Sequence, residues 1–379
     1  MNRTNRILIT ITKGISKISA REVEEITGRR PEASENTLTV DLDEESVYRL
    51  ILWGRTIYKV IHVLDEGMFT DLDELATKIG RLDFKLFGGD GGFALRTSRY
   101  GDHSFTSLDA NRVVGASIYK GLKRAGYDVK VDLTDPRYEY ILRIVDENYV
   151  FGINLSGESL HIRGYRVWSH PAALKNSLAA AMILLSGFWD ETLIDPMAGG
   201  GTIPIEAALY RYRIAPGLYR PTHPIADIPY YGREGYLEVR REAEEEVLSE
   251  GPEIIYNDIS CRYMLGGRRN AESAGVDKMI TFMCIDARSL SDRISIDEPS
   301  IAVTNPPYGI RGTRRDVIPE LYKALVEELD SMGVYKIVSI TSRYREMKEA
   351  LLDNGYEIRE NLQVLHGKLT TRISLAVKN

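Results

Sequence analysis

The sequence predicts an α/β protein whose C-terminal half forms a doubly wound, mostly parallel sheet, preceded by an α+β region. From residue 186 onward, short β-branched and apolar runs alternate with helical segments, the pattern of a parallel sheet covered by helices. Before residue 155, several strand-like runs are joined by short turns, which is typical of α+β units. The length of 379 residues suits two or three domains.

The N-terminal half is expected to contain two α+β units. The run 6–12 is β-branched and apolar, and the helical spacing over 15–26 ends at Gly28, a residue suited to a C-cap. The first unit should contain strands 6–12, 37–42 and 55–64 and helices 15–26 and 43–52. The second should contain strands 93–98, 129–133, 138–145 and 149–155, and a helix over 107–125 capped by Ser107.

The C-terminal half is expected to begin after a connector at 156–170. Its predicted strands are 192–194, 253–256, 280–284, 300–303, 336–341, 357–365 and 371–377. Its predicted helices are 174–185, 204–210, 262–274, 318–332 and 347–354. Residues 211–250 interrupt this rhythm with Pro216, Pro221 and Pro224 and a charged helix near 234–248, so we expect an insertion there.

Composition excludes several classes of protein. Apolar residues make up 43% and charged residues 27%, as in an ordinary globular protein. The longest apolar run, 178–185, is far shorter than the ~20 residues that a bilayer requires. Two cysteines, Cys261 and Cys284, are too few for a disulfide framework or a metal cluster, so we expect a reducing cytoplasm and no metal. The absence of a coiled-coil pattern favours a monomer.

Charge and amide content add two indications. The net charge is −6, yet residues 1–30 and 96–130 each carry seven Lys/Arg against three acids, so positive charge gathers in the N-terminal half. Gln363 is the single glutamine of the chain, a depletion that favours a source growing at high temperature, although nine methionines argue the other way.

A glycine turn follows the predicted strand 192–194, with the sequence Asp195-Pro-Met-Ala-Gly-Gly-Gly-Thr202. Glycines let the backbone turn sharply and approach a ligand, and open α/β sheets bind cofactors at this edge. The turn matches neither the dinucleotide fingerprint nor the phosphate loop. Its acid suits a cationic amino group, which favours S-adenosylmethionine (SAM). The expected contacts are Asp195, Ala198, Gly199, Gly200, Gly201 and Thr202.

Two more acids follow the next two predicted strands. Asp258, followed by Ile259, suits the hydroxyls of a ribose. Asp286, followed by Ala287, suits the adenine amine. Each acid alone is more often a helix N-cap, but three acids at three successive strand ends indicate a cofactor site. We therefore expect these four residues to bind SAM.

The loop Asn305-Pro306-Pro307-Tyr308 follows the fourth predicted strand. Its prolines fix the backbone and remove two donors. An exocyclic base amine is a poor nucleophile because its lone pair is delocalised. The Asn305 side chain and the Pro306 carbonyl could hold the two amine hydrogens and direct the lone pair at the methyl group. Tyr308 could stack on the extruded base. Asn305, Pro306 and Tyr308 are thus the predicted catalytic residues, with Asn305 also beside the cofactor.

Together these motifs resemble those of the THUMP-domain guanine N2-methyltransferases over nearly the whole chain. The matching segments are 163–166, 170–175, 195–208, 257–275 and 305–309. The resemblance implies a Rossmann-like class I methyltransferase fold, SAM as cofactor and the N2 amine of a tRNA guanosine as target, as in archaeal enzymes that act on position six of the acceptor stem. Met197 and Gly200 depart from the commoner first motif.

The same resemblance implies a division of the chain. Residues 1–65 would form a ferredoxin-like domain, 66–155 the THUMP domain, 156–185 a linker and first helix, and 186–379 the methyltransferase domain with its insertion at about 211–250. The first two domains bind tRNA in that family. Charge clustering nominates as RNA contacts Arg96, Arg99, His103, Lys120, Lys123, Arg124 and Arg311.

Four alternatives stay open or are disfavoured. A ribosomal RNA guanine N2-methyltransferase would have the same architecture. A DNA adenine N6-methyltransferase shares the Asn-Pro-Pro-Tyr loop, but would normally carry a target-recognition domain instead of this N-terminal half. A cytosine C5 enzyme needs a cysteine in the loop after a strand, where neither cysteine lies. A catalytically inactive RNA-binding protein is disfavoured by the acids and Asn305.

Overall fold

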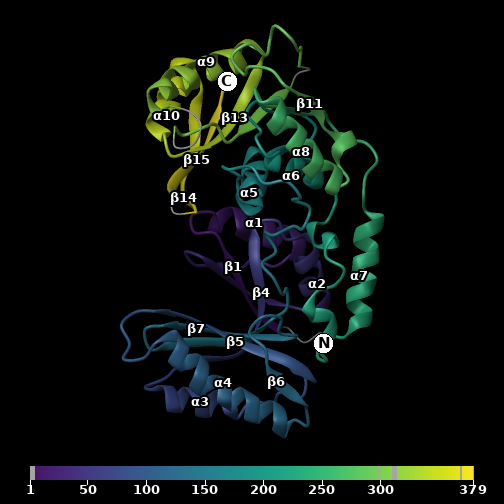
Figure 1. Ribbon diagram of the computed structural model, residues 1–379, viewed down its shortest axis with the longest axis vertical. Helices are drawn as coiled ribbons and strands as arrows, with labels where there is room; N and C mark the ends of the chain where they lie inside the picture. The colour runs from purple at the N-terminus through teal and green to yellow at the C-terminus, as the bar shows by residue number, and fades with distance from the viewer. Residues whose placement is uncertain (1–4, 297–298, 310–313, 368, 379) are drawn as a thin grey trace.

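The computed structural model describes residues 5–296, 299–309, 314–367 and 369–378. Two sheets organise the described chain, and Figure 1 shows the C-terminal half above the N-terminal half. The expected α/β class with a mostly parallel C-terminal sheet and an α+β region before it is confirmed.

The N-terminal half is built on one continuous sheet of eight described strands in the order β2-β3-β1-β4-β8-β7-β5-β6. Because β4 pairs with both β1 and β8, the boundary expected at residue 65 falls inside this strand. Helices α3 and α4 cover one face of the sheet beside β5 and β7 (Figure 1). The elements are β1 (Asn5–Ile11), α1 (Ser16–Thr27), β2 (Glu32–Ala33), β3 (Thr37–Leu42), α2 (Glu44–Trp53), β4 (Ile57–Met68), α3 (Leu72–Gly80), β5 (Gly91–Tyr100), α4 (Ser107–Arg124), β6 (Val129–Val131), β7 (Tyr138–Val145) and β8 (Asn148–Asn154).

Capping side chains set the starts of these helices. Asp43 accepts a hydrogen bond from the Ser46 amide and caps α2. Helix α4 begins with a capping box in which Thr106 and Asp109 exchange bonds. The cap expected at Ser107 was therefore wrong by one residue, because only a residue preceding the first helical turn can use its side chain in this way.

The C-terminal half is a second sheet, with the described strand order β11-β10-β9-β12-β13-β15-β14. All pairings among the first five strands are parallel, and β15 runs antiparallel to both neighbours. The elements are α5 (Asn176–Ser186), β9 (Thr192–Asp195), α6 (Thr202–Arg211), α7 (Arg233–Glu245), β10 (Ile254–Asn257), α8 (Cys261–Ser273), β11 (Thr281–Met283), β12 (Ser300–Thr304), α9 (Ile318–Ser331), β13 (Val334–Thr341), α10 (Tyr344–Asp353), β14 (Glu357–His366) and β15 (Leu369–Val377).

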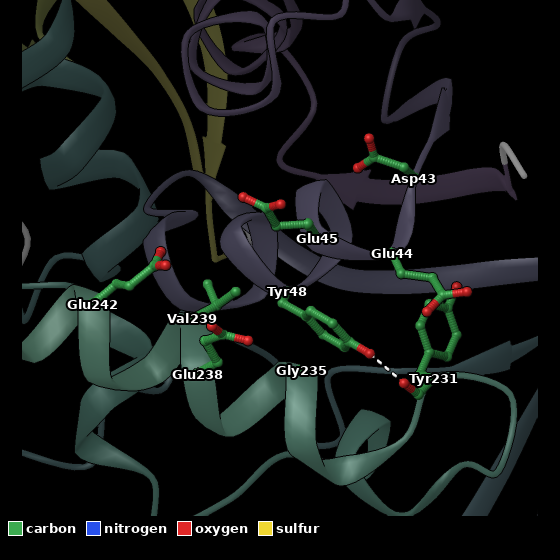
Figure 2. A pocket seen from close by; sticks show the side chains of 9 residues that line it. All are labelled: Asp43, Glu44, Glu45, Tyr48, Tyr231, Gly235, Glu238, Val239 and Glu242. Carbon is green, nitrogen blue, oxygen red and sulfur yellow. Dashed lines mark hydrogen bonds between the residues drawn. The ribbon is translucent and has the colours of Figure 1, made fainter. Parts of the chain in front are cut away.

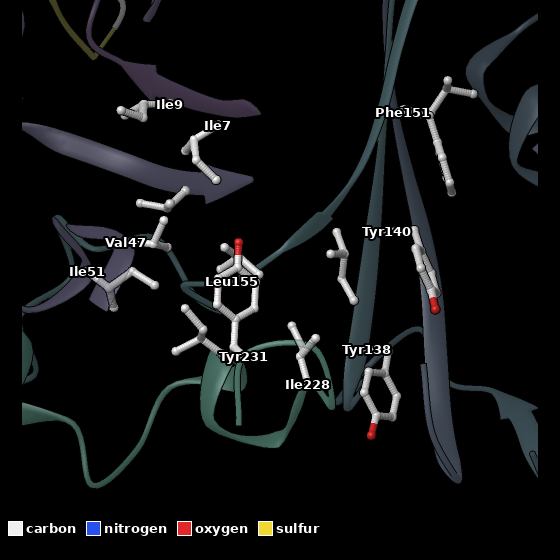
Figure 3. Packing of buried hydrophobic residues seen from close by; sticks show 14 of the residues in the cluster. Ile7, Ile9, Val47, Ile51, Tyr138, Tyr140, Phe151, Leu155, Ile228 and Tyr231 are labelled. Carbon is white, nitrogen blue, oxygen red and sulfur yellow. The ribbon is translucent and has the colours of Figure 1, made fainter. Parts of the chain in front are cut away.

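The insertion between α6 and β10 packs on the N-terminal half. Tyr231 and Tyr236 are buried in the same apolar core as residues of β1, β4 and α2. Figure 3 shows Tyr231 and Ile228 among Ile7, Val47 and other N-terminal side chains. Helix α7 lies along α2 (Figure 1). The charged helix expected in this region is present, and its apolar face completes the core of the preceding half.

A cavity of about 490 Å³ lies between α2 and α7 (Figure 2). The Tyr48 hydroxyl donates a hydrogen bond to the Tyr231 carbonyl at its floor. Its charged lining residues are all acidic: Asp43, Glu44, Glu45, Glu238 and Glu242. Carboxylates repel phosphate, so this surface is unsuited to binding RNA.

A buried ion pair joins the connector to the C-terminal half. Arg163 meets Glu206 of α6 at 3.2 Å, and both side chains are at most 1% exposed. Arg163 also donates to the carbonyl of Arg55, whose own guanidinium donates to the Leu209 carbonyl. Removing one partner of such a pair leaves a buried charge uncompensated, so this network fixes the two halves against each other.

None of the helices in the described ranges has the length and apolar character needed to cross a membrane.

Candidate active site

The strand order places two predicted loops side by side. From β9 the chain continues to β10 and β11 on one side of the sheet, whereas β12 and β13 lie on the other. Both β10 and β12 pair with β9 in parallel, so their carboxyl ends meet at one edge. Such a topological switch point is where open α/β sheets bind ligands. Asp195 ends β9, and the loop after β12 carries Asn305.

The glycine turn adopts a backbone that requires glycine. Gly199 and Gly201 have φ of 54° and 78°, in the left-handed region, and Gly201 immediately precedes α6. The Ala198 amide donates to the Asn257 carbonyl at 2.8 Å, and the Tyr256 hydroxyl donates to the Gly199 carbonyl at 2.5 Å. Neighbouring strand β10 therefore holds the turn in place.

The connector forms a strap across this turn. The Asn270 amide donates to the carbonyls of Trp168 and Gly200, both at 3.0 Å, and its oxygen accepts from the Trp168 amide. The His170 ring lies so close to the turn that a Cβ on Gly199 would meet it at 3.3 Å. His170 also packs edge-on against Tyr263, with 4.4 Å between ring centroids. Asn270 thus fastens α8, the strap and the turn together.

Asp195 is a buried acid at the start of the turn, 1% exposed. One carboxylate oxygen accepts a hydrogen bond from the Met197 amide at 3.2 Å. Burial raises the pKa of Asp195 to about 8, and no basic side chain of the described residues is among the groups acting on it. A ligand ammonium would supply the missing positive charge, so this environment fits the amino group predicted from the sequence.

Asp258 and Asp286 lie at the ends of β10 and β11, in different environments. The two oxygens of Asp258 accept from the Gly199 and Ser260 amides, both at 2.9 Å, and burial raises its pKa. Asp286 already forms a two-pronged ion pair with Arg288, which lowers its pKa. Asp258 therefore lies against the turn, whereas Asp286 would have to share its carboxylate with Arg288.

The residues beside these acids differ in exposure. Ile259 is 67% exposed, and Ala287 is 4% exposed. An exposed aliphatic side chain and a small apolar residue after neighbouring strands suit a flat apolar ring. Asn257, which is fully buried, bonds the carbonyls of Pro196 and Ile285 and so joins the ends of β9, β10 and β11.

Helix α9 supports the Asn-Pro-Pro-Tyr loop. The Tyr322 hydroxyl donates to the Pro307 carbonyl at 2.9 Å and contacts Thr341 of β13. The Tyr308 hydroxyl donates to the Asn305 side-chain oxygen at 2.5 Å. Burial raises the pKa of Tyr308, so this hydroxyl stays protonated. Without substrate, the Asn305 side-chain oxygen, which we expect to accept from a base amine, thus accepts from Tyr308 instead.

The nominated RNA contacts do not form one surface. Side chains alternate along β5, so Arg96 and Arg99 point to opposite faces of the sheet. Arg96 binds the Leu133 carbonyl and Glu139. Arg99 contacts His103, which in turn contacts the Asp146 carbonyl.

The remaining nominated contacts lie on α4 or beyond the described ranges. Lys120, Lys123 and Arg124 are on α4, where Lys123 pairs with Asp128 and Arg124 donates to the Gly80 carbonyl. Arg311 lies outside the described residues.

Several site residues escaped the sequence analysis. Tyr256, Asn270, His170 and Tyr322 hold the loops, but each reaches them from an element distant in sequence. Asn257 could have been found from the sequence, because it is a polar residue at the end of the otherwise apolar strand β10. The two cysteines also form a disulfide, which the sequence analysis did not foresee. No group of three or more His, Cys, Asp or Glu within the described ranges is arranged to hold a metal.

Comparisons with known proteins give the family and the fold. The model of an RMKL-like methyltransferase domain matches residues 163–372, and that of a THUMP domain matches residues 69–154. The chain is 32% identical to a tRNA (guanine(6)-N2)-methyltransferase of Methanocaldococcus jannaschii, covering 96% of this chain and 98% of the relative. A protein of the same name from Archaeoglobus fulgidus is 30% identical, with 97% and 91% covered. The fold matches a methyltransferase solved with S-adenosylhomocysteine (SAH), with a TM-score of 0.86, 20% identity, and 100% and 99% covered.

Proposed function

The chain belongs to the family of RMKL-like methyltransferases that carry a THUMP domain, and we propose that it uses SAM to methylate the N2 amine of a guanosine in tRNA. The guanosine is at position six of the acceptor stem, by similarity to the two archaeal relatives. The observation that carries the proposal is the switch point, where Asn305 follows β12 beside the turn that follows β9.

The residues around the turn fit SAM. Asp195 would bind its ammonium, Asp258 its ribose, and Asp286 its adenine amine beside Ile259 and Ala287. The backbone of the turn would follow the amino-acid part, through Ala198, Gly199, Gly200, Gly201 and Thr202. When bound, SAM supplies a methyl group on a sulfonium, whose reactivity leaves positioning as the main task of the protein.

The target amine would be held by the Asn305 side-chain oxygen and the Pro306 carbonyl. As the base enters, its amine replaces the Tyr308 hydroxyl on Asn305, and the freed Tyr308 ring stacks on the base. The nitrogen lone pair would accept the methyl group that bound SAM supplies, with SAH as the remaining product. Asn305 stabilises the positive charge that develops on nitrogen, and the proton then leaves to water.

The N-terminal half would bind the tRNA. Arg96 lies on one face of the sheet, whereas Arg99 and His103 lie beside Phe105, just before α4, so these two groups would contact RNA separately. We further propose that the protein acts as a monomer in the cytoplasm, where the tRNA substrate is used, and that Arg311 adds a phosphate contact.

The proposal is tested by incubating the protein with labelled SAM and unmodified tRNA, followed by nucleoside mass spectrometry and mapping of the modified position. We expect N2-methylguanosine at position six. Asn305→Ala should lose methylation by at least about 100-fold while SAH binding persists, and Asn361→Ala, an exposed asparagine on β14, should behave as wild type. Methylation of ribosomal RNA alone, or full activity of Asn305→Ala, would overturn the proposal.

A further inference from the structure

A disulfide joins two loops of the proposed cofactor site. Cys261 is the first residue of α8, Cys284 directly follows β11, and their Cα atoms are 5.2 Å apart. The two cysteines lie 23 residues apart in the chain. Two residues distant along the chain can be neighbours in a parallel sheet, because β10 and β11 end at the same edge.

The bond supports the weakest edge of the C-terminal sheet. Strand β11 has three residues and, among the described strands, pairs only with β10. The segment after it is held on its inner side by Asn257, whose side chain exchanges hydrogen bonds with the Ile285 backbone at 3.0 Å. On its other side, the disulfide ties this segment covalently to the start of α8.

The attached segments carry the residues proposed to bind adenosine. Asp258 and Ile259 lie three and two residues before Cys261, and Asp286 lies two residues after Cys284. The same first turn of α8 carries Tyr263, whose ring packs on His170 against the glycine turn. One bond thus links the adenine side of the site to the ribose side and, through Tyr263, to the strap.

We propose that the Cys261–Cys284 disulfide is a positioning element that holds the two sides of the adenosine subsite at the separation the cofactor needs. This rests on the proposed function, because it takes SAM as the ligand. A site held in its bound form loses less entropy on binding. Without the bond, the loops would have to be ordered by the ligand itself, and we expect affinity to fall by about tenfold.

A disulfide in this position is compatible with an intracellular enzyme. Such bonds are rare in a reducing cytoplasm but common in intracellular proteins of hyperthermophiles. The scarcity of glutamine in this chain favours a source of that kind. Cys261 is exposed and Cys284 half-buried, so an added reductant can reach the bond.

The test compares oxidised and reduced forms of the full-length protein. A water-soluble phosphine reduces the bond: the disulfide takes up two electrons and two protons to give two thiols, and the phosphine becomes its oxide with oxygen from water. Mass spectrometry after alkylation counts the thiols. Titrations then measure the binding of SAH and of 5′-methylthioadenosine, which lacks the amino-acid part.

We expect reduction to weaken both ligands by the same factor of about tenfold, because both contain adenosine. The KM for SAM should rise, while kcat at saturating SAM and the KM for tRNA stay unchanged. The variant Cys261→Ser/Cys284→Ser should match the reduced wild type and be unaffected by the phosphine. If that variant fails to fold, the oxidised protein is compared with reduced wild type alone, and circular dichroism checks that the reduced protein keeps its fold.

Three outcomes would overturn the inference: two free thiols in protein purified under oxidising conditions, equal SAH affinities before and after reduction, or a change in the KM for tRNA without one for SAM. Absence of SAH binding in the oxidised protein would instead refute the proposed function. The two failures are therefore distinguishable.

Discussion

Binding of the cofactor should expel a proton from Asp195. In the ligand-free protein, burial raises the pKa of this acid to about 8. The SAM ammonium is expected beside it, and a nearby positive charge favours the ionised carboxylate. The bound state should therefore contain aspartate where the free state contains aspartic acid.

The size of the effect follows from the pKa. At pH 7 a group with a pKa of about 8 is roughly nine-tenths protonated, so each SAH bound should release about 0.9 proton. For the same reason, affinity for SAH should rise by nearly tenfold from pH 6 to pH 7 and change little once the acid has ionised. In the absence of ligand, folded Asp195 keeps its proton where the unfolded chain has lost it. The stability of the free protein should therefore fall as pH rises from about 4 to about 8.

Calorimetric titration with SAH at pH 7, in two buffers of different ionisation enthalpy, measures the proton release directly. Asp195→Asn cannot release a proton and serves as the control. 5′-methylthioadenosine has no ammonium and should release none from the wild type. A binding enthalpy that does not depend on the buffer would show that the ammonium does not meet Asp195.

Four further substitutions, at three positions, test the other residues that shape the site. Asn270→Ala removes two hydrogen bonds to carbonyls and two from the Val167 and Trp168 amides, so the free energy of unfolding should fall by about 4 kcal/mol in urea titrations. SAH should also bind more weakly, and unchanged SAH affinity would contradict the role of Asn270 in holding the turn. Glu206→Gln leaves Arg163 buried without its counter-charge and should cost about 3–5 kcal/mol in the same assay, so a loss below about 1 kcal/mol would refute that account. Tyr308→Phe frees the Asn305 oxygen and keeps the ring, so the kcat/KM of tRNA methylation should stay within about threefold of wild type. Tyr308→Ala removes the ring that stacks on the base and should lower kcat/KM by about 10- to 100-fold. Equal losses in the two variants would assign the effect to the hydroxyl.

Local patterns were sufficient to predict most elements and the two central loops. Short apolar runs located β9 and β12. Asp195, which ends β9, and Asn305, which follows β12, lie where a switch point requires. The family resemblance was needed for guanine and tRNA, because the Asn-Pro-Pro-Tyr loop suits any exocyclic amine.

Features that depend on distant contacts could not be predicted in this way. Asn270 holds the glycine turn from a helix some 70 residues away in sequence, and no local period marks such a partner. The pairing of Cys261 with Cys284 depends on the parallel alignment of β10 and β11. Charge clustering nominated Arg96 and Arg99 together, but the two-residue repeat of a strand separates them onto opposite faces.

The packing of the insertion has a consequence for biosynthesis. Tyr231 and Tyr236 complete the N-terminal core, yet they are encoded after β9 and α6 of the C-terminal sheet. N-terminal domains usually fold first as a chain leaves the ribosome. Here the first half lacks part of its interior until α7 has emerged, so it should gain protection from proteolysis only in nascent chains that extend past residue 245. Its maturation is tied to synthesis of the catalytic half, and a truncated product would not present a finished RNA-binding module on its own.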